Sequence, residues 1–284
     1  MSIPHSKTAL ITGANSGLGK ATAHALADAG WRVGLVARDA ARGASALAGI
    51  QTATGNPDVH LFVADLANQS AVRGLAQQVL ERFASLQLLV NNAGTACPAR
   101  RLSPDGIEYT LAVNHLAPFL LTRLLLPRLT SSAPARIVNV GTRIDTAMDF
   151  SDLNWERRPY RMMAAYGQSK LGNLHLTFEL ARRLQGSGVT VNAVFPGIFT
   201  SHLGGTDGAQ GWFWTLVARL LGWALPAPEQ AARRVLFAAT AEEMAGVNGQ
   251  YLGNRKPIQA PAQALDAEAN RQLWERSEKL TGEF

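Results

Sequence analysis

Tyr166 and Lys170 carry the clearest chemistry in the sequence. They stand four residues apart in a segment, 164–185, whose apolar periodicity predicts a helix, so their side chains share one helix face. A free phenol has a pKa of about 10 and is a poor base at neutral pH. A neighbouring ammonium favours the phenolate and lowers that pKa. The pair therefore predicts a phenol that gives a proton to a developing alkoxide or removes one from an alcohol; the alternative is an ordinary helix face.

A glycine-rich turn joins the first predicted strand to the first predicted helix. Its glycines let the backbone approach a pyrophosphate closely, and the helix N-terminus offers free N–H groups and the positive end of the helix dipole. The turn therefore predicts a dinucleotide site; the alternative is a common strand-to-helix turn. The predicted contacts in this turn are Gly13, Asn15, Ser16, Gly17, Leu18 and Gly19.

The end of the second predicted strand discriminates between the two nicotinamide dinucleotides. An acidic residue there would hold the ribose 2′-hydroxyl of NAD. The sequence instead places Arg38 at the strand end, where it can pair with a 2′-phosphate, and Asp39 opens the next helix as its cap. We therefore expect NADP(H), with Arg42 as a second phosphate contact; NAD(H), and a plain surface arginine at position 38, are the alternatives.

Short apolar runs alternate with helix-length patterns along the chain. The runs are apolar at nearly every position, which is typical of strands buried on both faces of a parallel sheet. The repetition predicts an α/β fold, a doubly wound parallel sheet, in a single domain over residues 1–284. The expected strands are Thr8–Gly13, Arg32–Arg38, Val59–Asp65, Leu86–Asn91, Arg136–Val140, Val189–Phe195 and Gly249–Leu252. The expected helices are 17–29, 40–52, 69–84, 107–129, 164–185, 229–239 and 266–280.

Composition excludes several classes of protein. Of the 284 residues, 47% are hydrophobic and 17% charged, which excludes a disordered chain and a coiled coil. The single cysteine, Cys97, excludes an internal disulfide framework, and the six histidines lack metal-ligand spacing, so no metal is expected. The net charge of +6 is dispersed along the chain, which argues against a nucleic-acid partner.

No segment has the pattern of a transmembrane span. The longest apolar stretches, 115–129 and 212–226, each contain an arginine and fall short of the ~20 residues that a bilayer-spanning helix needs. We therefore expect a soluble, cytoplasmic protein. A nucleophile elbow is also missing, which excludes the obvious α/β-hydrolase interpretation.

Six motifs in order resemble the short-chain dehydrogenase/reductase family, and the resemblance runs from about Thr8 to the end of the chain. The phrases at 113–122 and 273–282, with the long gap before Tyr166, are similar to the retinol-dehydrogenase-like branch. The resemblance implies a Rossmann-type fold. The motifs are Thr12-Gly-x-x-x-Gly-x-Gly19, Asp65, Asn91-Asn92-Ala93-Gly94, Asn114, Tyr166-x-x-x-Lys170 and Pro196-Gly197.

The resemblance also implies roles for these residues. Asn114 would organise a water chain toward Lys170. Lys170 and Tyr166 would also contact the cofactor. The adenine would be flanked by Asp65 and Leu66, the ribose by Asn92, Ala93 and Gly94, and the nicotinamide end by Pro196, Gly197, Ile198 and Thr200.

One position departs from the family pattern. The family usually has a serine after the fifth strand to donate a hydrogen bond to the carbonyl oxygen, whereas this chain reads Gly141-Thr142. The Thr142 hydroxyl can donate the same bond, and its extra methyl restricts its rotamers and narrows the pocket. The substitution bears on the rate of turnover but not on the cofactor site.

The segment 198–228 differs from the rest of the chain. By resemblance it is a variable arm that caps the substrate pocket, and its aromatic residues Trp212, Phe213 and Trp214 favour a hydrophobic substrate. The alternatives are a core or subunit-interface helix and, less favoured, a membrane-surface helix. In the family the helices expected at 107–129 and 164–185 pair subunits, so we expect a homodimer or homotetramer.

Three functions remain open on the sequence. The leading one is an NADP(H)-dependent oxidoreductase acting on an apolar alcohol, ketone or aldehyde. The others are a cofactor-binding regulatory protein that lost catalysis with its serine, and an NADPH-dependent double-bond reductase on the same scaffold. The intact Tyr166 and Lys170 favour an enzyme.

Overall fold

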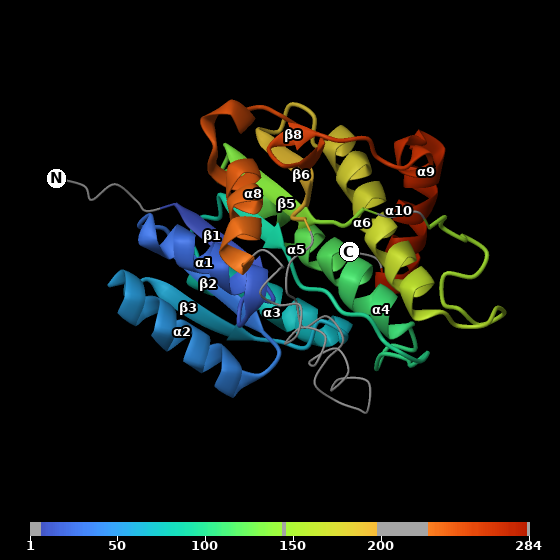
Figure 1. Cartoon of the computed structure of the whole chain (residues 1–284), viewed down its shortest axis with the longest axis horizontal. Helices are drawn as coiled ribbons and strands as arrows, with labels where there is room; N and C mark the ends of the chain where they lie inside the picture. Colours follow the sequence, from blue (N-terminus) through green and yellow to red (C-terminus); the bar gives the residue numbers. More distant parts are fainter. Residues whose placement is uncertain (1–6, 144–145, 198–226, 283–284) are drawn as a thin grey trace.

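The chain folds around one eight-stranded sheet in strand order β3-β2-β1-β4-β5-β6-β7-β8 (Figure 1). Our computed structural model describes residues 7–143, 146–197 and 227–282. Strands β1 to β7 run parallel, and only the last pair, β7 and β8, is antiparallel. The order reverses between β1 and β4, which creates the crevice where such sheets bind ligands. The predicted doubly wound α/β fold is confirmed.

The strands are β1 Thr8–Thr12, β2 Arg32–Ala37, β3 Val59–Val63, β4 Leu88–Asn91, β5 Ala135–Val140, β6 Val189–Phe195, β7 Tyr251–Gly253 and β8 Lys256–Pro257. The longer helices are α1 Gly17–Asp28, α2 Ala40–Thr54, α3 Gln69–Arg82, α5 Ala117–Ser131, α6 Met162–Arg183, α8 Pro228–Thr240 and α10 Ala267–Thr281. The short ones are α4 Tyr109–Leu111, the π-helix η1 Ala112–Leu116, the 3₁₀ turn η2 Glu242–Met244 and α9 Ala262–Leu265. The sequence predicted neither β8 nor α9, which are two and four residues long.

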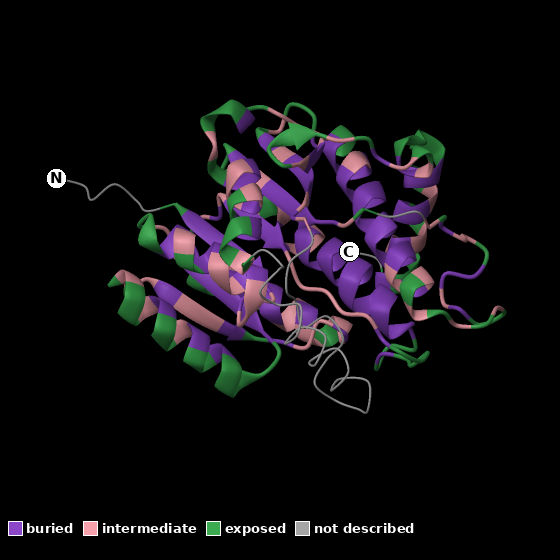
Figure 2. Cartoon of the chain, viewed as in Figure 1, coloured by how far each residue is buried: buried purple, intermediate pink, exposed green. Residues whose placement is uncertain are grey.

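Helices cover both faces of the sheet, and the buried residues gather between the layers (Figure 2). One core joins α1, α2 and α8 to the sheet, through residues such as Leu26, Ile50 and Val235. The core on the other face joins α3, α5 and α6, through residues such as Leu75, Phe119 and Leu180. Both faces of the central strands are therefore buried, which explains why these strands are apolar at almost every position.

The helix expected at 107–129 differs from the prediction in its start and its regularity. It begins two residues later, because the buried Glu108 carboxylate caps it by accepting hydrogen bonds from the backbone N–H groups of Thr110 and Leu111. A π-turn, Ala112–Leu116, then interrupts the α-helical pattern before α5. The run Tyr109–Ser131 is long and apolar enough to cross a membrane by length and composition alone, but 78% of its most apolar window is buried inside this fold.

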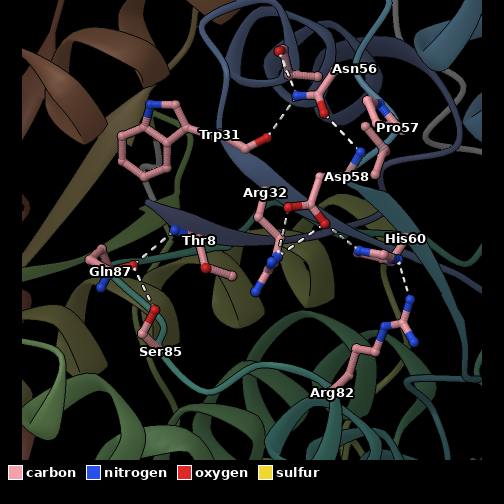
Figure 3. A network of polar contacts seen from close by, with 12 residues as sticks. Thr8, Trp31, Arg32, Asn56, Pro57, Asp58, His60, Arg82, Ser85 and Gln87 are labelled. Carbon is pink, nitrogen blue, oxygen red and sulfur yellow. Dashed lines mark hydrogen bonds and ion pairs between the residues drawn. The ribbon is translucent and has the colours of Figure 1, made fainter. Parts of the chain in front are cut away.

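A polar cluster ties the amino-terminal edge of the sheet together (Figure 3). Arg32 at the start of β2 pairs with Asp58 at 2.9 Å, and Asp58 accepts a 2.8 Å bond from His60 Nε2. Arg82, in the last turn of α3, donates to His60 Nδ1 at 3.1 Å. His60 is therefore the neutral Nε2–H tautomer. The cluster fixes the ends of β2, β3 and α3 at the edge opposite to the predicted site.

A buried histidine makes stability depend on pH. His115, in the π-turn, bonds Ser277 of α10 at 2.8 Å, and its burial, with His175 nearby, lowers its pKa to about 3. The proton therefore binds the unfolded chain first, and stability falls as pH drops below 6.5. Between about pH 7 and about pH 5, the free energy of unfolding should therefore fall by about 2 kcal/mol less in His115→Gln than in the unmodified chain.

Urea denaturation at the two pH values measures this difference. His24→Gln alters an exposed histidine of α1 and serves as the matched control, which should keep the pH dependence of the unmodified chain. An equally steep loss of stability in His115→Gln would contradict the assignment.

Candidate active site

The predicted site residues gather at the carboxyl edge of the sheet. The glycine turn follows β1, Arg38 follows β2, Asp65 follows β3 and Asn92 follows β4. The residues after β5 and β6 lie at the same edge because these strands are parallel. Ile198 and Thr200, and the arm 198–228 up to residue 226, lie outside the described residues.

The glycine turn is held by its neighbour strand. Asn92 Nδ2 donates to the carbonyl oxygens of Thr12, at 2.8 Å, and Gly13, at 3.3 Å. The Thr12 hydroxyl accepts bonds from the backbone N–H groups of Asn92 and Ala93. A Cβ at Gly19 would lie 2.5 Å from Asn92 Nδ2 and against the Gly13 carbonyl, so no side chain fits there. The glycine turn is therefore packed closely against Asn92, which holds its backbone in place for contact with a phosphate. We call this turn the phosphate cradle.

The start of α1 has no side-chain cap among the described residues. Ser16 is the N-cap residue but makes no side-chain capping bond, and the first turn contains no acidic side chain. Gly13 and Gly17 have φ of +65° and +52°, a region that favours glycine, and a Cβ at Gly17 would meet nothing within 4 Å. Asn15 and Leu18 complete the turn. Free N–H groups and open space at this helix end suit an anion.

Arg38 is oriented by a residue that sequence reasoning missed. Its Nη1 donates to the Tyr109 hydroxyl at 3.1 Å, and the Arg101 guanidinium lies 3.5 Å from the centroid of the Tyr109 ring. Asp39 caps α2 through the backbone N–H of Arg42, at 2.8 Å, as predicted. Two arginines thus flank one buried tyrosine beside the end of β2, with the exposed Arg42 one turn away.

Asp65 shapes the loop that follows β3. Its carboxylate accepts a bond from the backbone N–H of Ala67 at 3.0 Å, which places Leu66 beside a small apolar cluster. The cluster consists of Ala67, Cys97, Tyr109 and Val113. A half-buried leucine next to a carboxylate is suited to an adenine ring, and the arrangement is compatible with the role implied for Asp65 and Leu66.

Asn114 links the loop after β4 to α6. Its Oδ1 accepts from the backbone N–H of Thr95 at 2.7 Å, and its Nδ2 donates to the Thr95 carbonyl at 2.8 Å and to Ser169 Oγ at 2.9 Å. Ser169 in turn donates to the Tyr166 carbonyl. The side chain of Asn114 is fully buried, which rules out a solvent-facing asparagine. Ser169 acts as a positioning residue; its place between Tyr166 and Lys170 is the only sequence signal for it.

Tyr166 and Lys170 share a helix face, but the ammonium does not lower the pKa of the phenol. Lys170 Nζ donates to the Val140 carbonyl at 3.0 Å, and a Cβ at Gly94 would lie 3.2 Å from the same nitrogen. Burial raises the pKa of Tyr166 to about 12, against a smaller lowering by its hydrogen bond with Thr142. The prediction of an acidified phenol is therefore wrong for this structure, because desolvation dominates. Burial lowers the pKa of Lys170 to about 8.

Thr142 occupies the position predicted for the carbonyl-oxygen donor. Its side chain lies near enough to the Tyr166 phenol to lower the pKa of that group slightly. Its backbone carbonyl accepts a 2.7 Å bond from the Tyr251 hydroxyl of β7. Tyr251 is a second residue that sequence reasoning missed, since nothing in the β7 sequence marks it. The side chains of residues 142 and 166 thus lie near each other, as proton transfer to a shared oxygen requires.

The described residues fit a dinucleotide along this edge. The arginine after β2, the cradle and the N-terminus of α1 after β1, and the lysine near Gly94 after β4 follow one another in the order of the strands, as a dinucleotide lying across the edge would meet them. Pro196 and Gly197 follow β6 at the far end of that line. Among residues 7–143, 146–197 and 227–282, no group of histidine, cysteine, aspartate and glutamate could hold a metal ion. A cavity of about 1070 Å³ opens at the opposite edge, beside Lys7, Trp31 and Arg136, and contains none of the site residues.

The sequence pattern of the short chain dehydrogenases matches residues 7–210. This chain belongs to the short-chain dehydrogenase family. Among its relatives are human retinol dehydrogenase 13, 42% identical over 97% of this chain and 85% of the relative, and mouse retinol dehydrogenase 14, 40% identical over 98% and 86%. The resemblance to the retinol-dehydrogenase-like branch is thereby confirmed.

Solved structures show the same fold in other members of the family. A putative uncharacterized protein from Mycobacterium paratuberculosis superposes with a TM-score of 0.78, at 34% identity over 97% of this chain and 93% of that one. The RhlG/NADP active-site complex from Pseudomonas aeruginosa superposes with a TM-score of 0.65, at 30% identity over 87% and 94%. This short-chain dehydrogenase is thus an oxidoreductase by family and Rossmann-type by fold.

Proposed function

We propose that this chain is an NADP(H)-dependent oxidoreductase that transfers a hydride between nicotinamide and an apolar alcohol, ketone or aldehyde, with Tyr166 as the general acid and base. The observation that carries the proposal is that Thr142 lies near the Tyr166 phenol, with Lys170 one helical turn after Tyr166, on the same edge of the sheet as the phosphate cradle. Relatives named retinol dehydrogenases and an NADP complex of a family member support it.

The side chains of this chain supply proton transfer and charge stabilisation. A nicotinamide bound at this edge would supply or accept the hydride. Tyr166 is protonated at neutral pH because burial raises its pKa to about 12, so it is ready to give its proton to the oxygen of a carbonyl being reduced. Thr142 would donate a hydrogen bond to that oxygen. Lys170 is buried one helical turn after Tyr166 and donates to the Val140 carbonyl at the end of β5.

Arg38 carries the preference for NADP(H). A guanidinium held beside the end of β2 by the Tyr109 hydroxyl is preorganised for a 2′-phosphate, and Arg101 adds a second positive charge on the other side of the ring. The described residues at this strand end place no carboxylate where a ribose 2′-hydroxyl would need one, since Asp39 is engaged in capping α2.

Arg38→Gln should weaken NADPH binding about 30-fold, because charge-assisted hydrogen bonds of this kind contribute about 2 kcal/mol. The dissociation constant for NADH should stay within about twofold, since that nucleotide lacks the 2′-phosphate. Fluorescence titration of both nucleotides measures the effect, and Arg42→Gln shows whether the exposed arginine contributes. Equal weakening of both nucleotides would contradict the assignment of Arg38.

The relatives' names and the apolar residues in the sequence of the arm at 198–228 support the substrate class. Retinal and retinol are the first members of the substrate panel because of the relatives' names, followed by shorter apolar aldehydes and ketones. The homo-oligomeric state, the cytoplasmic location and the role of the arm at 198–228 remain predictions of the sequence.

The test is to incubate the protein with NADPH and the carbonyl panel, follow the loss of NADPH absorbance, and identify the products. An alcohol as product supports the proposal. A product with a saturated carbon–carbon bond and an intact carbonyl would favour the double-bond reductase, and NADPH binding without turnover would favour the regulatory protein.

A further inference from the structure

Arg234 of α8 reaches the carboxyl edge of the sheet beside the end of β6. A Cβ placed on Gly197 would lie against Arg234 Nη1 and 3.1 Å from its Cζ, so the guanidinium lies directly over this glycine. Gly197 also has φ of +92°, which an L side chain rarely adopts. A side chain at position 197 would therefore clash with the guanidinium, and glycine leaves room for it.

Helix α8 brings this arginine to the same side of the sheet as the phosphate cradle. α8 packs against α1, and the two helices share one core through Ala23, Ala231 and Val235 (Figure 1). The N-terminus of α1 and the head of Arg234 thus lie at the same edge and on the same face of the sheet. A dinucleotide running from Arg38 past α1 to Gly197 would pass between them.

The described residues give the guanidinium no partner that accounts for its position. Within residues 7–143, 146–197 and 227–282 it makes no hydrogen bond or ion pair, although it is partly buried. Two other cations lie near this end of the site: Lys170 donates to the Val140 carbonyl, and the Arg143 guanidinium lies 5.4 Å from the centroid of the Phe195 ring. A pyrophosphate carries two negative charges, and the dipole of α1 is only a partial positive charge.

We propose that Arg234 binds the pyrophosphate of the dinucleotide at the phosphate nearer the nicotinamide, through charge-assisted hydrogen bonds from its guanidinium. The inference rests on the proposed function, because it assumes that a nicotinamide dinucleotide lies along this edge. A planar guanidinium can contact two phosphate oxygens at once, which a lysine cannot do with the same geometry. Arg234 would thus complement the N-terminus of α1 from the opposite side of the cofactor.

Calorimetric titration of the full chain with three ligands tests the proposal. NADPH and 2′-phospho-ADP-ribose contain both phosphates of the pyrophosphate, whereas 2′,5′-ADP lacks the phosphate on the nicotinamide side. Arg234→Gln should weaken the first two ligands about tenfold and leave 2′,5′-ADP within about twofold. Arg234→Lys should show an intermediate loss, and it keeps a charge at the position if the glutamine variant folds poorly.

Arg233→Gln is the matched control, because Arg233 is the preceding residue of α8 and is exposed. It should bind all three ligands like the unmodified chain. If Arg234→Gln and Arg234→Lys bind NADPH as well as Arg233→Gln does, or if 2′,5′-ADP weakens as much as NADPH, the proposal is overturned while the proposed function stands. If the unmodified chain binds no NADPH, both are overturned.

Discussion

Tyr166→Phe should lower kcat for carbonyl reduction about 10³-fold, because it removes the proton that the developing alkoxide takes up. The change keeps the ring and its packing, so the dissociation constant for NADPH should stay within about twofold. Burial holds the phenol protonated at neutral pH, and the neighbouring Thr142 opposes this shift only weakly. Single-turnover measurement of NADPH oxidation with an accepted carbonyl gives the rate of the chemical step.

Tyr160→Phe is the matched control for this variant. Tyr160 is also partly buried, but its hydroxyl bonds to Glu108 at 3.0 Å and to the Cys97 carbonyl, away from Lys170. Loss of that hydroxyl should change kcat less than about tenfold. If Tyr166→Phe kept a rate within tenfold of the unmodified enzyme, another group would have to supply the proton.

Thr142→Val should lower kcat by about 10²- to 10³-fold, the range found when one donor to a developing oxyanion is removed. Valine matches threonine in shape and keeps the backbone carbonyl that accepts the Tyr251 bond, so only the donor is lost. Thr142→Ser should retain most of the activity because the serine hydroxyl can donate the same bond. Steady-state kinetics with NADPH binding measured in parallel separates chemistry from cofactor affinity.

A second threonine provides the control for Thr142. Thr190 lies in β6, and its buried hydroxyl has no hydrogen-bond partner among the residues that the structure describes. Thr190→Val makes the same chemical change there and should leave kcat unaltered. Unchanged turnover in Thr142→Val would show that the carbonyl oxygen is held by some other donor.

The strands and the order of the site motifs could be predicted because both are local properties of the sequence. Apolar runs such as Arg32–Ala37 are buried on both faces, and each motif lies immediately after such a run. Parallel strands then bring the motifs to one edge regardless of the details of packing. The glycine turn, Asp39 as a cap and the pairing of Tyr166 with Lys170 on one face were accessible for this reason.

The remaining features depend on contacts between distant segments. Asn114 lies in the π-turn, and its side chain forms hydrogen bonds with Thr95 and Ser169, which are 19 and 55 residues away in the sequence. The Tyr109 bond to Arg38 and the Tyr251 bond to the Thr142 carbonyl span 71 and 109 residues. No local sequence pattern predicts contacts between residues so far apart in the chain.

The protonation of Tyr166 illustrates the same limit. The sequence shows that a lysine shares its helix face, which argues for a lower pKa. It does not show that the phenol is mostly buried or that Lys170 is directed to the Val140 carbonyl. Desolvation outweighs the neighbouring charge once the fold is complete. The consequence is a phenol that starts as an acid, which suits the reduction of a carbonyl.

A crystal structure of the chain with NADP⁺ tests the central claim most directly. We expect the diphosphate over the first turn of α1, the 2′-phosphate on Arg38, and the Tyr166 hydroxyl beside the nicotinamide ring. A coenzyme bound elsewhere, or a phenol turned from the ring into the protein interior, would contradict the account.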